Sequence, residues 1–188
     1  LVNNAGVVDL TEHAGVTSLR TLIAADNVGA MAAHADAAAD HALEDVTFLP
    51  VIPDPDKIMA VGLNYRSHVL EGGRDIPEWP MIFTRFSNSQ VGHGQAMIKP
   101  NASDMFDFEG EMAVIIGKTC RHVSEADALS VVAGYSCYND GSIRDYQRHT
   151  SQFVPGKSFY KSGAFGPWMV TADEIPDPAS LTLMTRLN

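Results

Sequence analysis

The sequence D-F-E-G-E-M at residues 107–112 runs directly into the apolar run A-V-I-I-G, so that two acids adjoin one of the most hydrophobic stretches of the chain. The apolar run is typical of a β-strand, in which residues i and i+2 point to the same face. Glu109 and Glu111 are therefore expected side by side at the end of a strand. Two such carboxylates repel each other, and a shared divalent cation removes the conflict. The alternative is a solvated strand end with two surface acids.

Composition restricts the classes of partner. The chain has 188 residues, of which 45% are hydrophobic and 19% are charged, enough to bury a substantial core in one domain or two. A net charge of −10 leaves no basic patch for nucleic acid, and no apolar stretch is long enough to span a membrane. The two cysteines, Cys120 and Cys137, lack metal-ligand spacing and are too few for a secreted disulfide framework. We therefore expect a cytoplasmic protein without nucleic-acid or membrane partners.

The first part of the chain differs in composition from the rest. A short strand pattern at 1–10 precedes an alanine-rich stretch at 18–43 that favours helix. Prolines at positions 50, 53 and 55 cannot continue a helix and suit an extended connector. We predict a small N-terminal α/β region over 1–55 and a larger domain over 56–188. Neither end resembles a natural terminus, so we expect the chain to be truncated at both ends.

The larger domain is expected to be α+β and rich in strands, with one helical pattern at 124–132. Two long stretches rich in Gly, Pro and polar residues, 71–80 and 148–165, are expected to be loops of the kind that form lids or binding surfaces. The predicted strands are 58–62, 81–85, 111–116, 133–139, 168–171 and 181–187.

The opening L-V-N-N-A-G is similar to a stretch of the short-chain dehydrogenases, which raises a nicotinamide enzyme as a rival class. Such enzymes use a Tyr-x-x-x-Lys pair and a Gly-rich turn for the pyrophosphate. Here Tyr65 is not followed by that lysine, and no G-x-x-x-G-x-G occurs. A turn between two short strands accounts for Asn3, Asn4 and Gly6.

Three further stretches place polar residues in apolar surroundings: V-G-L-N-Y-R-S-H-V-L-E-G-G at 61–73, Y-N-D-G-S-I-R-D-Y-Q at 138–147 and P-G-K-S-F at 155–159. Together with the paired acids, and in the same order, these motifs resemble the fumarylacetoacetate hydrolase family over residues 58–188. The resemblance implies the β-roll fold of that family.

The resemblance also implies a metal site. Glu109 and Glu111 would bind a divalent cation together with Asp140, normally Mg²⁺ or Mn²⁺, with Ca²⁺ as a further candidate. Taken alone, the Asn-Asp-Gly sequence around Asp140 would indicate a turn.

A catalytic pair is implied in the same way. His68 and Glu71 lie three residues apart and become neighbours in a helical turn. In the family such a pair acts on water or on the substrate, because a carboxylate beside an imidazole raises its basicity. Without the resemblance, His68 would be an ordinary loop histidine.

Further residues match the family motifs at positions that contact substrate. Lys157 would stabilise an enolate or a leaving group, and Arg144 would grip a substrate carboxylate, with Gln147 and Tyr65 completing the pocket. The alternative for each basic residue is a surface salt bridge.

The implied activity is metal-dependent hydrolysis of a C–C bond in a 2,4-dioxo acid of the acylpyruvate or fumarylpyruvate type, as in the degradation of aromatic compounds. The alternatives are an isomerase of the 5-carboxymethyl-2-hydroxymuconate type, a decarboxylase of oxaloacetate type, and a metal-binding protein without catalysis. A homodimer is also implied. Departures from the family pattern leave the substrate open, and they are Met112, Gly141, Ile143, Tyr160 and Ala164.

Overall fold

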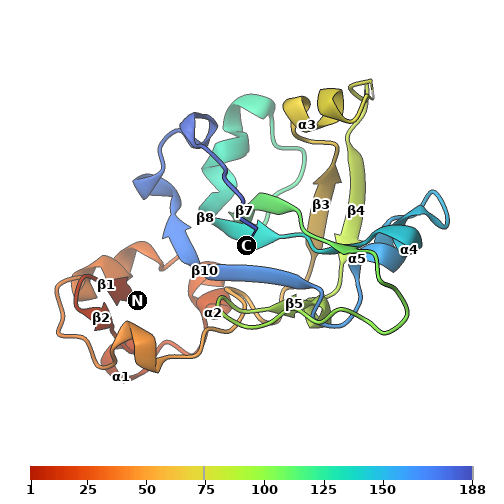
Figure 1. Ribbon diagram of the computed structural model, residues 1–188. Helices are drawn as coiled ribbons and strands as arrows, with labels where there is room; N and C mark the ends of the chain where they lie inside the picture. The colour runs from red at the N-terminus through yellow and green to blue at the C-terminus, as the bar shows by residue number, and fades with distance from the viewer. Residues whose placement is uncertain (74, 188) are drawn as a thin grey trace.

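The computed structural model describes residues 1–73 and 75–187 of the chain. Figure 1 shows a strand-rich molecule in which short helices surround a central sheet, and the N-terminal segments lie together at one end. The predicted strand-rich α+β class is confirmed.

The central sheet has four strands in the order β5 (Gln90–Val91), β10 (Gly163–Thr171), β8 (Val132–Asn139) and β7 (Gly110–Ile116). β10 runs parallel to β5 and antiparallel to β8, which is in turn antiparallel to β7. Gly110 at the start of β7 pairs with Asn139 at the end of β8. This register brings the two acids of the first motif beside Asp140.

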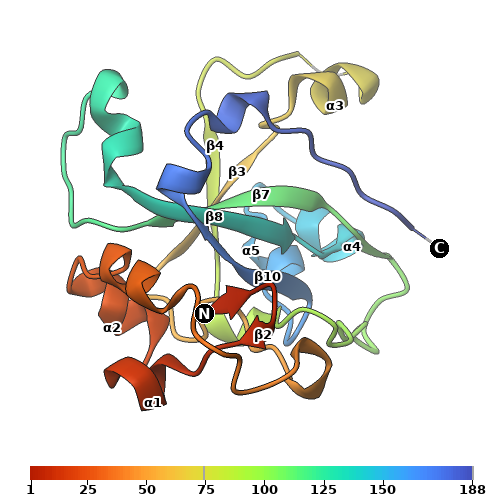
Figure 2. The same cartoon turned by 90° about the vertical axis from the view of Figure 1, so that its left-hand side faces the viewer.

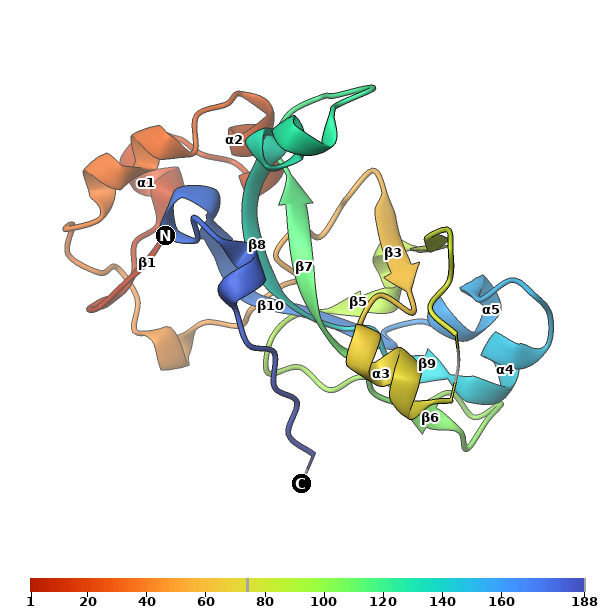
Figure 3. The same ribbon diagram turned by 90° about the horizontal axis from the view of Figure 1, so that it is seen from above.

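A second pair of strands, β3 (Ile58–Gly62) and β4 (Met81–Arg85), forms an antiparallel ribbon beside the central sheet (Figures 1 and 3). Both strands have the predicted bounds. Helix α3 (Arg66–Glu71) connects them and sits beyond the end of β3, and position 74 of the predicted loop over 71–80 lies outside the described residues. In β4 the side chains of Phe83 and Arg85 are buried, 8% and 3% exposed respectively.

Two short helices follow the segments that carry Glu109, Glu111 and Asp140. β6 (Phe106–Asp107) pairs with β9 (Ser142–Ile143), and α4 (Arg144–Arg148) and α5 (Val154–Lys157) come next. A Cβ atom at Gly156 would lie 2.4 Å from the backbone nitrogen of Gln147. Glycine at this position therefore allows α5 to pack closely against α4, and Lys157 at the end of α5 is buried, 1% exposed.

The N-terminal region begins with the hairpin of β1 (Val2–Asn3) and β2 (Gly6–Val7). The Asn3 side-chain oxygen accepts hydrogen bonds from the backbone nitrogens of Ala5 (2.9 Å) and Gly6 (3.2 Å), and Gly6 has a φ of 141° that disfavours other residues. The expected turn is confirmed. Helices α1 (Leu10–Ala14) and α2 (Leu19–Ala24) follow.

The helical expectation for 18–43 holds only in part. Beyond α2 the chain forms a 3₁₀ helix, Gly29–His34, and then continues without regular helix to a second short 3₁₀ turn, Leu43–Asp45. Alanine favours helix, but it offers little apolar surface to bury, and short helices are stable mainly through packing. The predicted helical pattern at 124–132 is likewise a 3₁₀ helix, Glu125–Val131. Further 3₁₀ turns are Ser87–Ser89, Ala172–Glu174 and Pro178–Ser180.

Two strand predictions need correction. The strand predicted at 168–171 begins earlier, at Gly163, so the loop predicted for 148–165 holds α5 and the start of β10. The segment 181–187 is not a strand. Its large apolar side chains remain exposed, 68% for Met184 and 73% for Leu187, and among the described residues it pairs with no other strand. Alternating residues form a strand only when a neighbouring backbone accepts their hydrogen bonds.

The core lies between the N-terminal region and the central sheet. Figure 2 shows the N-terminal region below the sheet. Ile23 of α2 packs with Ile115 of β7 and Phe165 of β10, and all three are more than nine-tenths buried. Within the described part of the chain, no helix combines the length and the hydropathy needed to cross a membrane.

Candidate metal centre

Three carboxylates converge where β7 begins and β8 ends. One oxygen from each of Glu109, Glu111 and Asp140 lies within 4.8 Å of the other two. The backbone holds them in place, because Asp140 N donates to Glu109 O (2.8 Å) and Glu109 N donates to Asn139 Oδ1 (3.0 Å). Among the described residues this is the one group of His, Cys, Asp and Glu side chains with metal-binding spacing.

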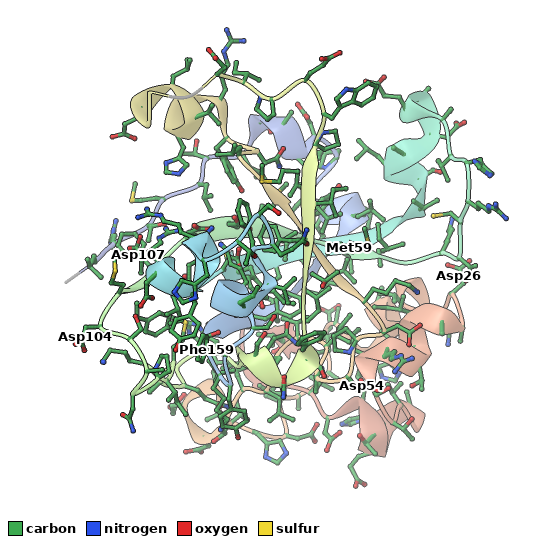
Figure 4. All side chains as sticks on the ribbon, turned by 90° about the vertical axis from the view of Figure 1, so that its right-hand side faces the viewer. Asp26, Asp54, Met59, Asp104, Asp107 and Phe159 are labelled. Carbon is green, nitrogen blue, oxygen red and sulfur yellow. The ribbon has the colours of Figure 1, made fainter. Side chains whose placement is uncertain are left out.

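Two basic side chains from α4 and α5 contact the acids. Lys157 Nζ lies 2.6 Å from both Glu109 Oε2 and Asp140 Oδ2, and the lysine side chain is 1% exposed. Arg144 donates to Glu109 Oε1 (2.5 Å) and to Asp107 Oδ2 (2.7 Å); Figure 4 shows Asp107 near α4. The side-chain oxygen of Gln147 accepts a third bond from Arg144 (3.0 Å). The predicted residues Lys157 and Arg144 thus contact the acids directly, and Gln147 contacts Arg144.

Among the described residues, basic side chains form ion pairs with Glu109 and Asp140 but not with Glu111. Burial raises the pKa of Glu111 to about 7, and the nearby carboxylates of Asp140 and Glu109 add to the rise. Three crowded carboxylates are the donor set that hard divalent cations prefer, so these residues fit Mg²⁺ or Mn²⁺. A cation bound by them would supply a positive centre that polarises an oxygen of the substrate.

The raised pKa predicts how stability depends on pH in the presence of a chelator. The folded state binds the Glu111 proton more tightly than the unfolded state does. The stabilisation of the fold by this proton is therefore fully present below pH 4.5 and is lost as the pH rises through about 7. Relative to Glu111→Gln, the free energy of unfolding should fall by about 2 kcal/mol between pH 5 and pH 8. Urea unfolding of both proteins with EDTA measures the difference. An identical pH profile for the two proteins would contradict this prediction.

The remaining predicted residues lie on or before α3. His68 and Glu71 are exposed on this helix, three residues apart, whereas Val69 of the same helix is buried, 1% exposed. Tyr65 Oη accepts a hydrogen bond from the backbone nitrogen of Met112 (3.2 Å). This bond ties the start of α3 to β7 at the residue after Glu111. Among the described residues, neither His68 nor Glu71 forms a hydrogen bond or an ion pair with the three acids, and their roles stay predictions.

Two contributors were not predicted from the sequence. Arg85 donates to Asp140 Oδ1, and Asp107 pairs with Arg144. A signal for Arg85 was present, since the strand M-I-F-T-R puts Phe83 and Arg85 on one face. A charged residue on the core-facing side of a strand requires a partner.

The fold and the site define a strand-rich domain with a cluster of three carboxylates whose spacing suits a metal ion. Residues 57–188 match the family model described as fumarylacetoacetate (FAA) hydrolase C-terminal, which covers well over half of the chain. The chain belongs to the fumarylacetoacetate hydrolase family, and the expected resemblance is confirmed.

Relatives of known name agree with this assignment. The chain is 42% identical over 144 residues to oxaloacetate tautomerase Fahd2a, mitochondrial, of Rattus norvegicus, covering 76% of this chain and 46% of the relative. A solved protein of Mycobacterium smegmatis, provisionally named HpcE, is 34% identical with a TM-score of 0.81, covering 95% of this chain and 65% of the other. The 2-hydroxyhepta-2,4-diene-1,7-dioate isomerase of Mycobacterium marinum is 34% identical with a TM-score of 0.60, covering 70% and 48%. The chain spans about half the length of the curated relatives it matches.

Proposed function

We propose that the protein is a divalent-metal-dependent enzyme that moves a proton between carbon and oxygen of a 2-oxo acid, as a tautomerase or isomerase. The observation that carries this proposal is the convergence of three carboxylates with the buried ammonium of Lys157. The names of the rat tautomerase and of the Mycobacterium marinum isomerase support the same type of reaction.

The reaction needs a group that stabilises negative charge on oxygen. When a base takes the proton from C3 of the substrate, the electron pair of the C–H bond becomes the C2–C3 double bond, and the π electrons of the C2 carbonyl move onto its oxygen. Lys157 is buried and directed at the acids, so its ammonium can stabilise that oxygen more strongly than an exposed lysine could. Arg144 is less than one-fifth exposed, and its planar guanidinium suits the substrate carboxylate.

Turnover assays test the proposal directly. Full-length protein should accelerate the enol-to-keto conversion of oxaloacetate or of a 2-hydroxymuconate, followed by ultraviolet absorbance, and EDTA should remove the activity. Mg²⁺ or Mn²⁺ should restore it. Release of CO₂ from oxaloacetate would instead indicate a decarboxylase. Bound metal without turnover of any substrate would favour a metal-binding protein that lacks catalysis.

Hydrolysis of a C–C bond in a 2,4-dioxo acid is a second candidate. The feature that favours it is the His68–Glu71 pair on α3, because hydrolysis needs a base to take a proton from water. Acetylpyruvate and fumarylpyruvate are the substrates to test, with release of pyruvate from acetylpyruvate as the readout.

Replacing His68 by Ala is expected to lower hydrolysis of a 2,4-dioxo acid by about a hundredfold or more, because general-base catalysis contributes on this scale. Mn²⁺ affinity should stay unchanged, since His68 is exposed on α3. Steady-state kinetics and calorimetric titration measure the two effects. Ser67→Ala, exposed on the same helix, serves as the control. Undiminished cleavage by the His68 variant would remove the base role.

The assembly and the cellular compartment stay predictions. The homodimer rests on the family resemblance alone. The rat relative is named as mitochondrial, while composition led us to expect the cytoplasm.

A further inference from the structure

Arg85 is a buried charge that the proposed reaction does not use. It lies at the end of β4 and is 3% exposed. Removing a guanidinium from water costs several kcal/mol unless hydrogen bonds satisfy it. Its partners are Asp140 Oδ1 (2.5 Å), Gly141 O (2.9 Å), Ser162 Oγ (2.9 Å) and both the hydroxyl and the carbonyl of Ser89 (3.2 and 3.5 Å).

The space for this guanidinium is shaped by three separate segments. Ser89 follows β4, Gly141 follows Asp140, and Ser162 precedes β10. A Cβ atom at Gly163 would lie 2.7 Å from Arg85 Nη2, so glycine leaves room for the side chain. Because the partners lie on different segments, they fix the plane of the guanidinium and, through it, the orientation of the Asp140 carboxylate.

The oxygens of Asp140 are divided between two cations. Arg85 binds Oδ1, whereas Lys157 contacts Oδ2. Glu109 is divided in the same way, with Arg144 on Oε1 and Lys157 on Oε2. In both carboxylates one oxygen pairs with an arginine and the other pairs with Lys157.

We propose that Arg85 is a positioning residue for metal binding: it holds Oδ1 of Asp140, so that Oδ2, which accepts from Lys157 and has a further lone pair, is the oxygen that binds a divalent cation. The inference rests on the proposed metal-dependent function. Binding through one oxygen suits the octahedral sites of Mg²⁺ and Mn²⁺, whereas Ca²⁺ takes more ligands and often both oxygens of a carboxylate. Arg85 thus also favours the smaller cations over Ca²⁺.

The test measures the affinities of Mn²⁺ and Ca²⁺ by calorimetry and the Mn²⁺ environment by electron paramagnetic resonance. Arg85→Gln should weaken Mn²⁺ binding by about tenfold or more, change the Mn²⁺ spectrum and reduce the preference for Mn²⁺ over Ca²⁺. In an Asp140→Asn background the same replacement should add less than about a twofold loss, because Arg85 acts through Asp140. Arg20→Gln is the matched control, since Arg20 is exposed and pairs with Asp54 and Asp56.

Each result decides the question. If the parent protein binds Mn²⁺ and Arg85→Gln binds it equally well, the positioning role is overturned while the proposed function stands. If the parent protein binds neither cation, the proposed function fails. If Arg85→Gln does not fold, Arg85→Lys replaces it, because lysine keeps the charge but cannot reach all four partners. This variant should weaken Mn²⁺ binding by about threefold or more, and unchanged affinity would again overturn the role.

Discussion

Replacing Lys157 by Met is expected to lower the free energy of unfolding by about 3–5 kcal/mol. The ammonium contacts Glu109 and Asp140 and is almost fully buried, so its loss leaves two carboxylates without a shared partner inside the protein. Methionine fills a similar volume, so the effect comes mainly from the charge and little from a cavity. Urea unfolding at constant pH with EDTA measures the change.

Lys118→Met is the control for this experiment, because Lys118 is exposed on the turn after β7. Its free energy of unfolding should stay within about 0.5 kcal/mol of the parent value. A loss below about 1 kcal/mol for Lys157→Met would show that the buried ammonium contributes little to the fold.

Glu109→Gln is expected to lower Mn²⁺ affinity by about tenfold or more, since the substitution removes one negative ligand and keeps the shape of the side chain. The basic side chains keep other partners, because Arg144 still pairs with Asp107 and Lys157 with Asp140. The fold should therefore persist while turnover falls with the metal. Calorimetric titration gives the affinity, and circular dichroism checks the fold.

Glu125→Gln provides the control of equal charge change, because Glu125 is exposed in the 3₁₀ helix before β8. It should bind Mn²⁺ as the parent does. Equal affinity of Glu109→Gln and the parent would remove Glu109 from the ligand set.

Much of the fold was predictable because strand signals are local. The bounds of β3 and β4 were predicted correctly from apolar runs between turn-forming residues. The approach of Glu109 and Glu111 to Asp140 followed from motif order and not from spacing, since the register of β7 on β8 brings the segments together. The family resemblance implied that the three acids share a metal ion, but it did not predict the strand register.

Local sequence patterns did not predict which residues of distant segments contact each other. Arg85 meets Asp140 across 55 positions and Ser162 across 77, and no local pattern predicts either contact. The strand prediction for 181–187 was wrong for a related reason. Its alternating pattern is local, but a strand also needs a partner strand elsewhere in the chain. The pairing of Arg144 with Asp107 likewise depends on β6 meeting β9.

The outermost position of β7 has a practical consequence. Its only ladder among the described residues is with β8, and Met112, Val114 and Ile116 on one face are 36%, 47% and 56% exposed. Tyr65 Oη accepts from Met112 N at this edge, but among the described residues no second strand covers it. A strand edge with apolar side chains and no partner strand is a template for pairing with another chain. Self-association of this polypeptide in solution can therefore arise from edge-to-edge contact of β7. Measurements of its oligomeric state should include a variant with a charged residue on β7, which separates this contact from any other subunit interface.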